Sequence, residues 1–192
     1  MEENFSPQDS LELIRSMISK TRANMGENKV YFLLWGWVTF AAIVSQFILK
    51  VVLRNERHYL VWLVVIPTVI INIIYATRRR NRPAVRTYVS ESMGYLWTGV
   101  GISFFVLSVI ISSRPAGWMD AWPLFILFYG LGTFVSGKIL QFKPLIMGGI
   151  FNWMLALASI FVAFDYQLLL AAAAILTSYI IPGHLLGSYK RN

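Results

Sequence analysis

Six apolar stretches dominate this 192-residue chain, each close to the roughly 20 residues that an α-helix needs to cross a membrane. They run over approximately Tyr31–Leu49, Tyr59–Ala76, Gly94–Ser112, Ala121–Leu140, Pro144–Phe164 and Gln167–Leu186. The connections are short, and the boundary between the last two stretches is the least marked because few polar residues separate them. The pattern predicts an all-α protein: an integral membrane bundle of six transmembrane helices preceded by an N-terminal amphipathic helix.

The composition supports this membrane assignment and excludes several other classes of protein. Hydrophobic residues make up 57% of the chain and charged residues 14%, whereas soluble domains hold about 45–50% and about 25%. A soluble enzyme, a disordered protein and a nucleic-acid-binding domain are therefore excluded. The net charge of +8 does not indicate a nucleic-acid partner, because the basic residues stand between the apolar stretches and at their ends. Disulfides and thiolate chemistry are excluded because the chain has no cysteine.

The distribution of basic residues predicts the orientation in the membrane. The N-terminal segment, the second and fourth connections and the C-terminus together hold 13 Lys and Arg, and the opposite side holds 4. By the positive-inside rule both termini are cytoplasmic, and we expect a multi-pass protein of the cell inner membrane. This divides the chain into a cytoplasmic segment with an interfacial helix (1–29), a transmembrane domain (30–187) and a short cytoplasmic tail (188–192).

The segment from Ser6 to Met25 is expected to form a helix that is too short and too charged to span a membrane. Pro7 suits the first helical position, and Asp9 places negative charge in the first turn. At about 100° per residue, apolar side chains gather on one face. The residues of this interfacial face are Leu11, Ile14, Met17 and Ile18. We expect the face to lie on the membrane surface or to dock on the cytoplasmic end of the bundle, either as an anchor or as a contact for a partner.

Few polar residues interrupt the apolar stretches, and the predicted orientation places most of them in the cytoplasmic half. The candidate polar interior consists of Asn72, Thr98, Ser136, Asn152 and His184. A buried amide in hydrocarbon needs hydrogen-bond partners, so Asn72 and Asn152 are expected to face the interior of the bundle. Two interpretations stay open, namely hydrogen bonds between helices and a polar cavity that opens to the cytoplasm.

Glycines and prolines predict where the helices pack closely or bend. Small residues allow helices to approach in lipid, and the chain offers them at Gly99, Gly101, Gly130, Gly132, Gly148 and Gly149. Each proline inside a helix removes a backbone donor and frees the carbonyl four residues earlier. For Pro67 and Pro182 the freed carbonyls belong to Leu63 and Ser178.

The densest run of charge lies in the second connection and consists of Arg78, Arg79, Arg80 and Arg82. Its simplest role is to set the topology. A more specific role would be to contact anionic lipid headgroups, which attract each basic residue near the membrane surface by about 1 kcal/mol.

Signatures of enzymes are mostly absent from the sequence. It has no His-Glu-x-x-His, no Gly-x-Ser-x-Gly and no phosphate-binding glycine loop. All nine carboxylates lie outside the apolar stretches or at their ends, so a proton- or cation-coupled transporter is also disfavoured. His58 and His184 fall on opposite sides of the membrane in this topology. We therefore assign no catalytic residue, no metal site and no cofactor.

Several short segments resemble those of a group of small uncharacterised bacterial integral membrane proteins. They are Ser10–Ile14 with Met17 and Ile18, Leu34–Trp37, Tyr95–Trp97 and Tyr179–His184. The resemblance implies a helical inner-membrane protein and carries no activity, so no functional residue is transferred from it.

Two functions from different classes follow from these observations. The first is a non-enzymatic structural or regulatory membrane protein that engages a cytoplasmic partner or anionic lipid. The alternative is a small channel or carrier with a polar cavity open to the cytoplasm. An intramembrane enzyme is the least favoured class, because no catalytic constellation is visible. The expected partners are membrane lipids, a cytoplasmic protein and a second copy of the chain.

Overall fold

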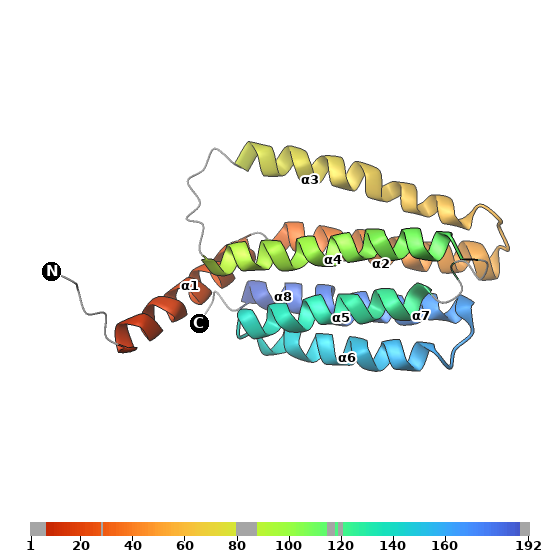
Figure 1. The fold of residues 1–192 in the computed structure, drawn as a ribbon. Coiled ribbons are helices and arrows are strands. Elements are labelled where there is room, and N and C mark those ends of the chain that lie inside the picture. Colours follow the sequence, from red (N-terminus) through yellow and green to blue (C-terminus); the bar gives the residue numbers. More distant parts are fainter. Residues whose placement is uncertain (1–6, 28, 80–87, 115–117, 119–120, 189–192) are drawn as a thin grey trace.

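The computed structural model describes residues 7–27, 29–79, 88–114, 118 and 121–188 (Figure 1). Within them the chain forms α1 and six further helical segments. α1 covers Pro7–Glu27. The first two of the six further segments are α2 (Lys29–Phe47) with the π-helical turn Ile48–Val52, and the 3-10 helix His58–Val64 with α3 (Val65–Arg79). The other four are α4 (Tyr88–Ser112), α5 (Ala121–Ile139), α6 (Lys143–Ser159), and α7 (Phe164–Ile175), which continues through the π-helical turn Leu176–Ile180 into α8 (Ile181–Ser188).

The six segments run alternately up and down between two ends of the molecule, as Figure 1 shows. We call the end that carries α1 and the last residues of α8 the α1 end. The other end, where residues 53–57 and 160–163 connect helices, is the distal end. α5 and α6 lie side by side, whereas α3 contacts α2 and the preceding 3-10 helix and diverges from the other helices (Figure 1).

Four helices of the described part of the chain are long and apolar enough to cross a membrane. They are Leu33–Val52, Tyr88–Ser112, Ala121–Ile139 and Phe164–Leu186, with mean hydropathies between 1.3 and 1.9. The apolar part of the second predicted span is shorter, at His58–Ile71, and α6 has only 17 residues. The all-α prediction is confirmed, and four of the six predicted spans correspond to candidate membrane helices, which indicates a multi-pass membrane protein.

Glycines bring α5 and α6 into close contact. A Cβ atom added at Gly137 would lie 2.6 Å from the backbone nitrogen of Ile146, and one added at Gly149 would lie 2.6 Å from the Cβ of Phe134. Gly148 is equally tight against the last helix, because its added Cβ would lie 2.8 Å from the carbonyl oxygen of Thr177. Backbones that approach this closely leave no room for side chains, so α5, α6 and the last helix form a tightly packed core.

The glycines of α4 behave differently from the prediction. A Cβ added at Gly94, Gly99 or Gly101 would meet no atom of another residue within 4 Å. The prediction that Gly99 and Gly101 mark a contact is therefore wrong for the single chain, because α5 packs on the other side of α4, against Val100 and Trp97.

The boundary between the last two helices also differs from the prediction. α6 ends at Ser159, and Phe164 to Gln167 form the first turn of α7 rather than a connection. The side-chain amide of Gln167 explains this, because its Nε2 donates to the carbonyl oxygens of Ser159 and Val162, both at 3.1 Å. The Ser159 carbonyl also accepts a hydrogen bond from the backbone nitrogen of Val162 at 3.2 Å, so the amide adds a second bond there and holds the short connection against the start of α7.

Pro67 and Pro182 each follow a turn that is not α-helical. The 3-10 helix His58–Val64 precedes Pro67, and the π-helical turn Leu176–Ile180 precedes Pro182. A change of helical register before the proline accommodates the missing backbone donor.

Candidate functional site

The second half of α1 is seated on the α1 end of the bundle. Met17 and Ile18 pack against a buried apolar cluster that α4, the α5–α6 turn, α6 and α8 build together. Its members are Val89, Met93, Leu140, Phe142, Leu145 and Leu186. Thr21 is buried beside this contact and donates its hydroxyl to the carbonyl of Met17 at 2.9 Å. The seat joins α1 to helices that are far apart in the sequence.

The first half of α1 has no such support. Figure 1 shows it extending beyond the end of the bundle. Leu11, Leu13 and Ile14 are 46–54% exposed, and these apolar side chains form a patch in the sense that no other described residue covers them. The four residues of the predicted interfacial face therefore divide into a docked pair, Met17 and Ile18, and an uncovered pair, Leu11 and Ile14.

Ser136 is buried in the core and contacts the side chain of Trp97 on α4. Its Oγ accepts a hydrogen bond from Trp97 Nε1 at 3.1 Å and donates to the carbonyl of Gly132 at 2.7 Å. Trp97 also packs edge-on against Tyr129 and Tyr179, with ring centroids 5.8 and 6.3 Å apart. This arrangement joins α4, α5 and the last helix.

Asn152 lies on α6 and is completely buried, at 0% exposure. Neither amide atom has a hydrogen-bond partner among the described residues. A Cβ added at Gly130 would lie 2.9 Å from the Cβ of Asn152, so the Asn152 side chain lies where α5 and α6 are in close contact. An unpartnered buried amide is costly, and it is the most unusual polar group of the core.

The other predicted interior residues do not join Ser136 and Asn152. Thr98 is exposed on α4 and donates to the carbonyl of Gly94, whereas His184 is exposed on α8, with its Nδ1 2.8 Å from the carbonyl of Ile180. Asn72 belongs to α3, and its side chain lies outside the described residues.

The arginine run lies at the end of α3 and beyond. Arg78 and Arg79 are the last residues of that helix, and their side chains lie outside the described part, as do Arg80 and Arg82 entirely.

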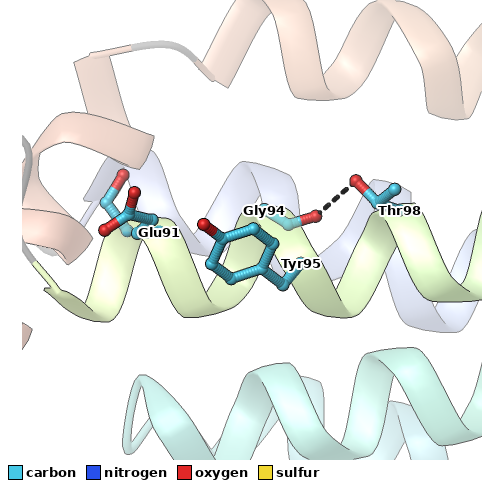
Figure 2. A pocket seen from close by; sticks show the side chains of 5 residues that line it. Glu91, Gly94, Tyr95 and Thr98 are labelled. Atoms are coloured by element: carbon cyan, nitrogen blue, oxygen red, sulfur yellow. Dashed lines mark hydrogen bonds between the residues drawn. The ribbon is translucent and has the colours of Figure 1, made fainter.

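A groove opens on the surface of α4 near the α1 end. It has a volume of about 400 Å³ and is lined by Ser90, Glu91, Gly94, Tyr95 and Thr98. Figure 2 shows Glu91, Tyr95 and Thr98 following one another along the helix, with the Thr98–Gly94 hydrogen bond between them. The groove thus combines a carboxylate at one end with an open glycine floor.

At the distal end, a second polar cluster forms from residues that the sequence alone did not connect. Lys50 Nζ pairs with Asp165 Oδ1 and also lies 4.0 Å from the ring centroid of Phe164. The ion pair links the π-helical turn after α2 to the first turn of α7. In the predicted topology both residues stand at the outer ends of the first and last spans, but that topology does not say which helices are neighbours.

The distal cluster continues through Gln46, which is 8% exposed. Gln46 Oε1 accepts a hydrogen bond from Trp62 Nε1 at 2.8 Å, and Gln46 Nε2 lies 3.3 Å from His58 Nδ1. Burial, and then the charge of Lys50, lowers the pKa of His58 from its ordinary 6.5, against the opposing effect of Asp165. His58 therefore favours its neutral form.

Comparisons with protein-family models, curated proteins and solved structures give no match to this chain. Within the described residues no group of three or more His, Asp and Glu side chains is placed to hold a metal ion.

Proposed function

We propose that this chain is a non-enzymatic inner-membrane protein, structural or regulatory, that holds a cytoplasmic protein partner through the exposed half of α1. One observation carries the proposal: Met17 and Ile18 fasten α1 to the bundle, and Leu11, Leu13 and Ile14 are left uncovered beyond it. A helix held at one end and apolar at the other is suited to lie in the groove of a second protein.

Charge favours a protein over an anionic lipid as the occupant of this patch. The segment Pro7–Glu27 contains three basic and three acidic residues, so α1 has no net charge to attract a lipid surface. Contacts with anionic headgroups are proposed instead for Arg78, Arg79, Arg80 and Arg82, which carry four positive charges within five residues.

The proposal includes six membrane spans with both termini in the cytoplasm, so that the α1 end faces inward. The alternating direction of the six segments supports this number, and α6 is about 26 Å long, short of the roughly 30 Å hydrocarbon core by only a few ångströms. Because the chain has no cysteine, each introduced cysteine is its sole thiol. Arg57→Cys and Gly117→Cys should react with an impermeant reagent from the periplasm, and Arg82→Cys and Lys190→Cys should not. Periplasmic reactivity of either of the last two would contradict the topology.

Site-specific photo-crosslinking in whole cells tests the partner. A photo-reactive residue at Leu13 or Ile14 should crosslink to a second polypeptide, whereas one at Ile18, in the docked half of the same helix, should crosslink within the chain. Ile14→Glu should abolish the crosslink from position 13 without preventing membrane insertion. Crosslinks from position 13 to lipid alone would refute the proposal.

The alternative function, a small channel or carrier open to the cytoplasm, is favoured by the unpartnered amide of Asn152. Water in a cavity would supply the missing hydrogen bonds. Single cysteines at Ser136 and Asn152 separate the two functions. Labelling by a water-soluble thiol reagent from the cytoplasmic side would support the cavity, and protection of both positions would support the packed bundle.

A further inference from the structure

The groove on α4 has a polar end and a long apolar continuation. We propose that it binds a membrane phospholipid whose headgroup carries a primary ammonium group. The inference rests on one part of the proposed function, namely that α4 spans the membrane with its first turns at the cytoplasmic surface. It goes beyond the proposed contact of α1 with a protein and of the arginine run with anionic lipid.

The polar end of the groove is suited to a cation. Among the lining residues that the structure describes, Glu91 alone carries a charge, and its carboxylate is exposed. Tyr95 is 72% exposed one turn further along the helix, on the same side in Figure 2. An ammonium with three N–H donors can bond the carboxylate directly, because charge-assisted hydrogen bonds are the strong ones.

The position of Glu91 along α4 corresponds to the depth of lipid headgroups. α4 has 25 residues and is therefore about 37 Å long, whereas the hydrocarbon core is about 30 Å thick. The first turn of α4 therefore reaches into the headgroup region, and Glu91 is its acidic residue. Thr98 lies about 10 Å deeper, within the acyl-chain region.

Beyond Thr98 the same face of α4 is apolar and uncovered. At 100° per residue the positions of Glu91, Gly94, Gly101, Ile102, Phe105 and Val109 fall within about 120°. Ile102, Phe105 and Val109 are 54–71% exposed, and a Cβ added at Gly101 meets nothing within 4 Å. The hydroxyls of Thr98, Ser103 and Ser108 all donate to carbonyls of α4 itself. The deeper face therefore offers an acyl chain an open apolar track.

A lipid fits this surface better than a second copy of the chain. The surface changes from a carboxylate at headgroup depth to aliphatic and aromatic side chains at hydrocarbon depth, which is the polarity profile of a phospholipid. A helix of a second copy would need an apolar or small face along its whole length and would leave Glu91 unpaired at the interface. Large exposed side chains, Tyr95 and Phe105 among them, also stand beside the glycines and limit close approach of another helix.

Native mass spectrometry of the purified full chain tests the site with two lipids of identical acyl chains. Phosphatidylethanolamine has ammonium hydrogens for Glu91, whereas phosphatidylcholine has none. We expect the protein to retain the ethanolamine lipid about tenfold more strongly, as one charge-assisted hydrogen bond allows. Glu91→Gln should remove this preference, and the matched control Glu12→Gln, at an exposed carboxylate of α1, should keep it. Gly101→Leu should weaken both lipids alike, because its side chain fills the apolar track.

The possible outcomes separate the inference from the proposed function. Equal retention of the two lipids by the unaltered protein overturns the lipid site even where cysteine labelling supports the topology. A dimer that Gly101→Leu abolishes, without lipid selectivity, assigns the face to a second copy and equally overturns it. If labelling shows that Tyr88–Ser112 does not cross the membrane, the proposed topology itself is wrong.

Discussion

Trp62 donates the hydrogen of its indole Nε1 to Gln46 Oε1 over 2.8 Å, and this bond joins the 3-10 helix at the distal end to α2. It also sets the orientation of the Gln46 amide, whose nitrogen then faces His58 Nδ1 at 3.3 Å. Trp62 continues the contact toward α5 through Trp122, with ring centroids 6.3 Å apart. One amide thus links α2 to the segment that leads into α3.

Gln46→Leu should destabilise the protein by about 1–3 kcal/mol, because Trp62 Nε1 loses the acceptor of a largely buried hydrogen bond. Thermal unfolding in detergent measures the effect. Ser45→Ala is the matched control, since Ser45 is the exposed neighbour on the same helix. If the two variants unfold at the same temperature, the bond contributes nothing to the fold.

Stability should fall as the pH is lowered through the titration of His58. Its pKa in the folded protein lies below the ordinary 6.5, owing first to burial and then to Lys50, so the unfolded chain binds the proton more readily. The contribution is fully present above about pH 6.5 and is lost as the pH falls through the lowered pKa of the folded state. Protonated Nδ1 could also no longer accept the hydrogen bond from Gln46 Nε2.

The measurement for His58, which precedes the proposed second span, is the unfolding temperature between about pH 5 and pH 8. His58→Gln should show a flatter pH dependence than the unaltered protein. Identical curves for the unaltered protein and His58→Gln would contradict the assignment.

Gly149→Ala should destabilise the bundle by about 1–3 kcal/mol, the usual cost of overpacking a core. The added methyl would lie 2.6–2.7 Å from Phe134 backbone and Cβ atoms, which cannot move without separating α5 from α6. Gly99→Ala is the matched control, because its methyl meets open space, and the better helix propensity of alanine should leave it neutral or stabilised by up to about 1 kcal/mol. Equal loss in both variants, measured by thermal unfolding, would disprove the contact.

Asn152→Leu should raise the free energy of unfolding by about 1–3 kcal/mol, because it removes an unpartnered buried amide and keeps a side chain of similar size. Denaturant titration in mixed micelles measures the change. Ser178→Ala is a useful comparison, since the Ser178 hydroxyl reaches the Gly148 carbonyl at 3.4 Å and its loss should cost stability. A less stable Asn152→Leu protein would mean that the amide is paired, through water or a ligand.

The location of each helix along the chain could be predicted from the sequence, whereas the exact ends of some helices could not. The apolar stretches, the polar connections and Pro7 near the start of the chain are local features, and they correspond to helices in the structure. The end of α6 was predicted five residues too late, because it depends on Gln167, whose side chain reaches back to the carbonyl of Ser159. Such a bond depends on how two helices meet and has no local pattern.

What the sequence by itself determined is the all-α fold, its apolar segments and the amphipathic character of α1, because hydrophobic periodicity and run length act along the chain. Only the tertiary structure decided which side chains meet. Run length places a residue at a depth along a helix but leaves the rotation of that helix and its neighbours open. Packing sets both, and it therefore placed Lys50 against Asp165, buried Asn152 beside Gly130, and left the face of Glu91 and Gly101 uncovered.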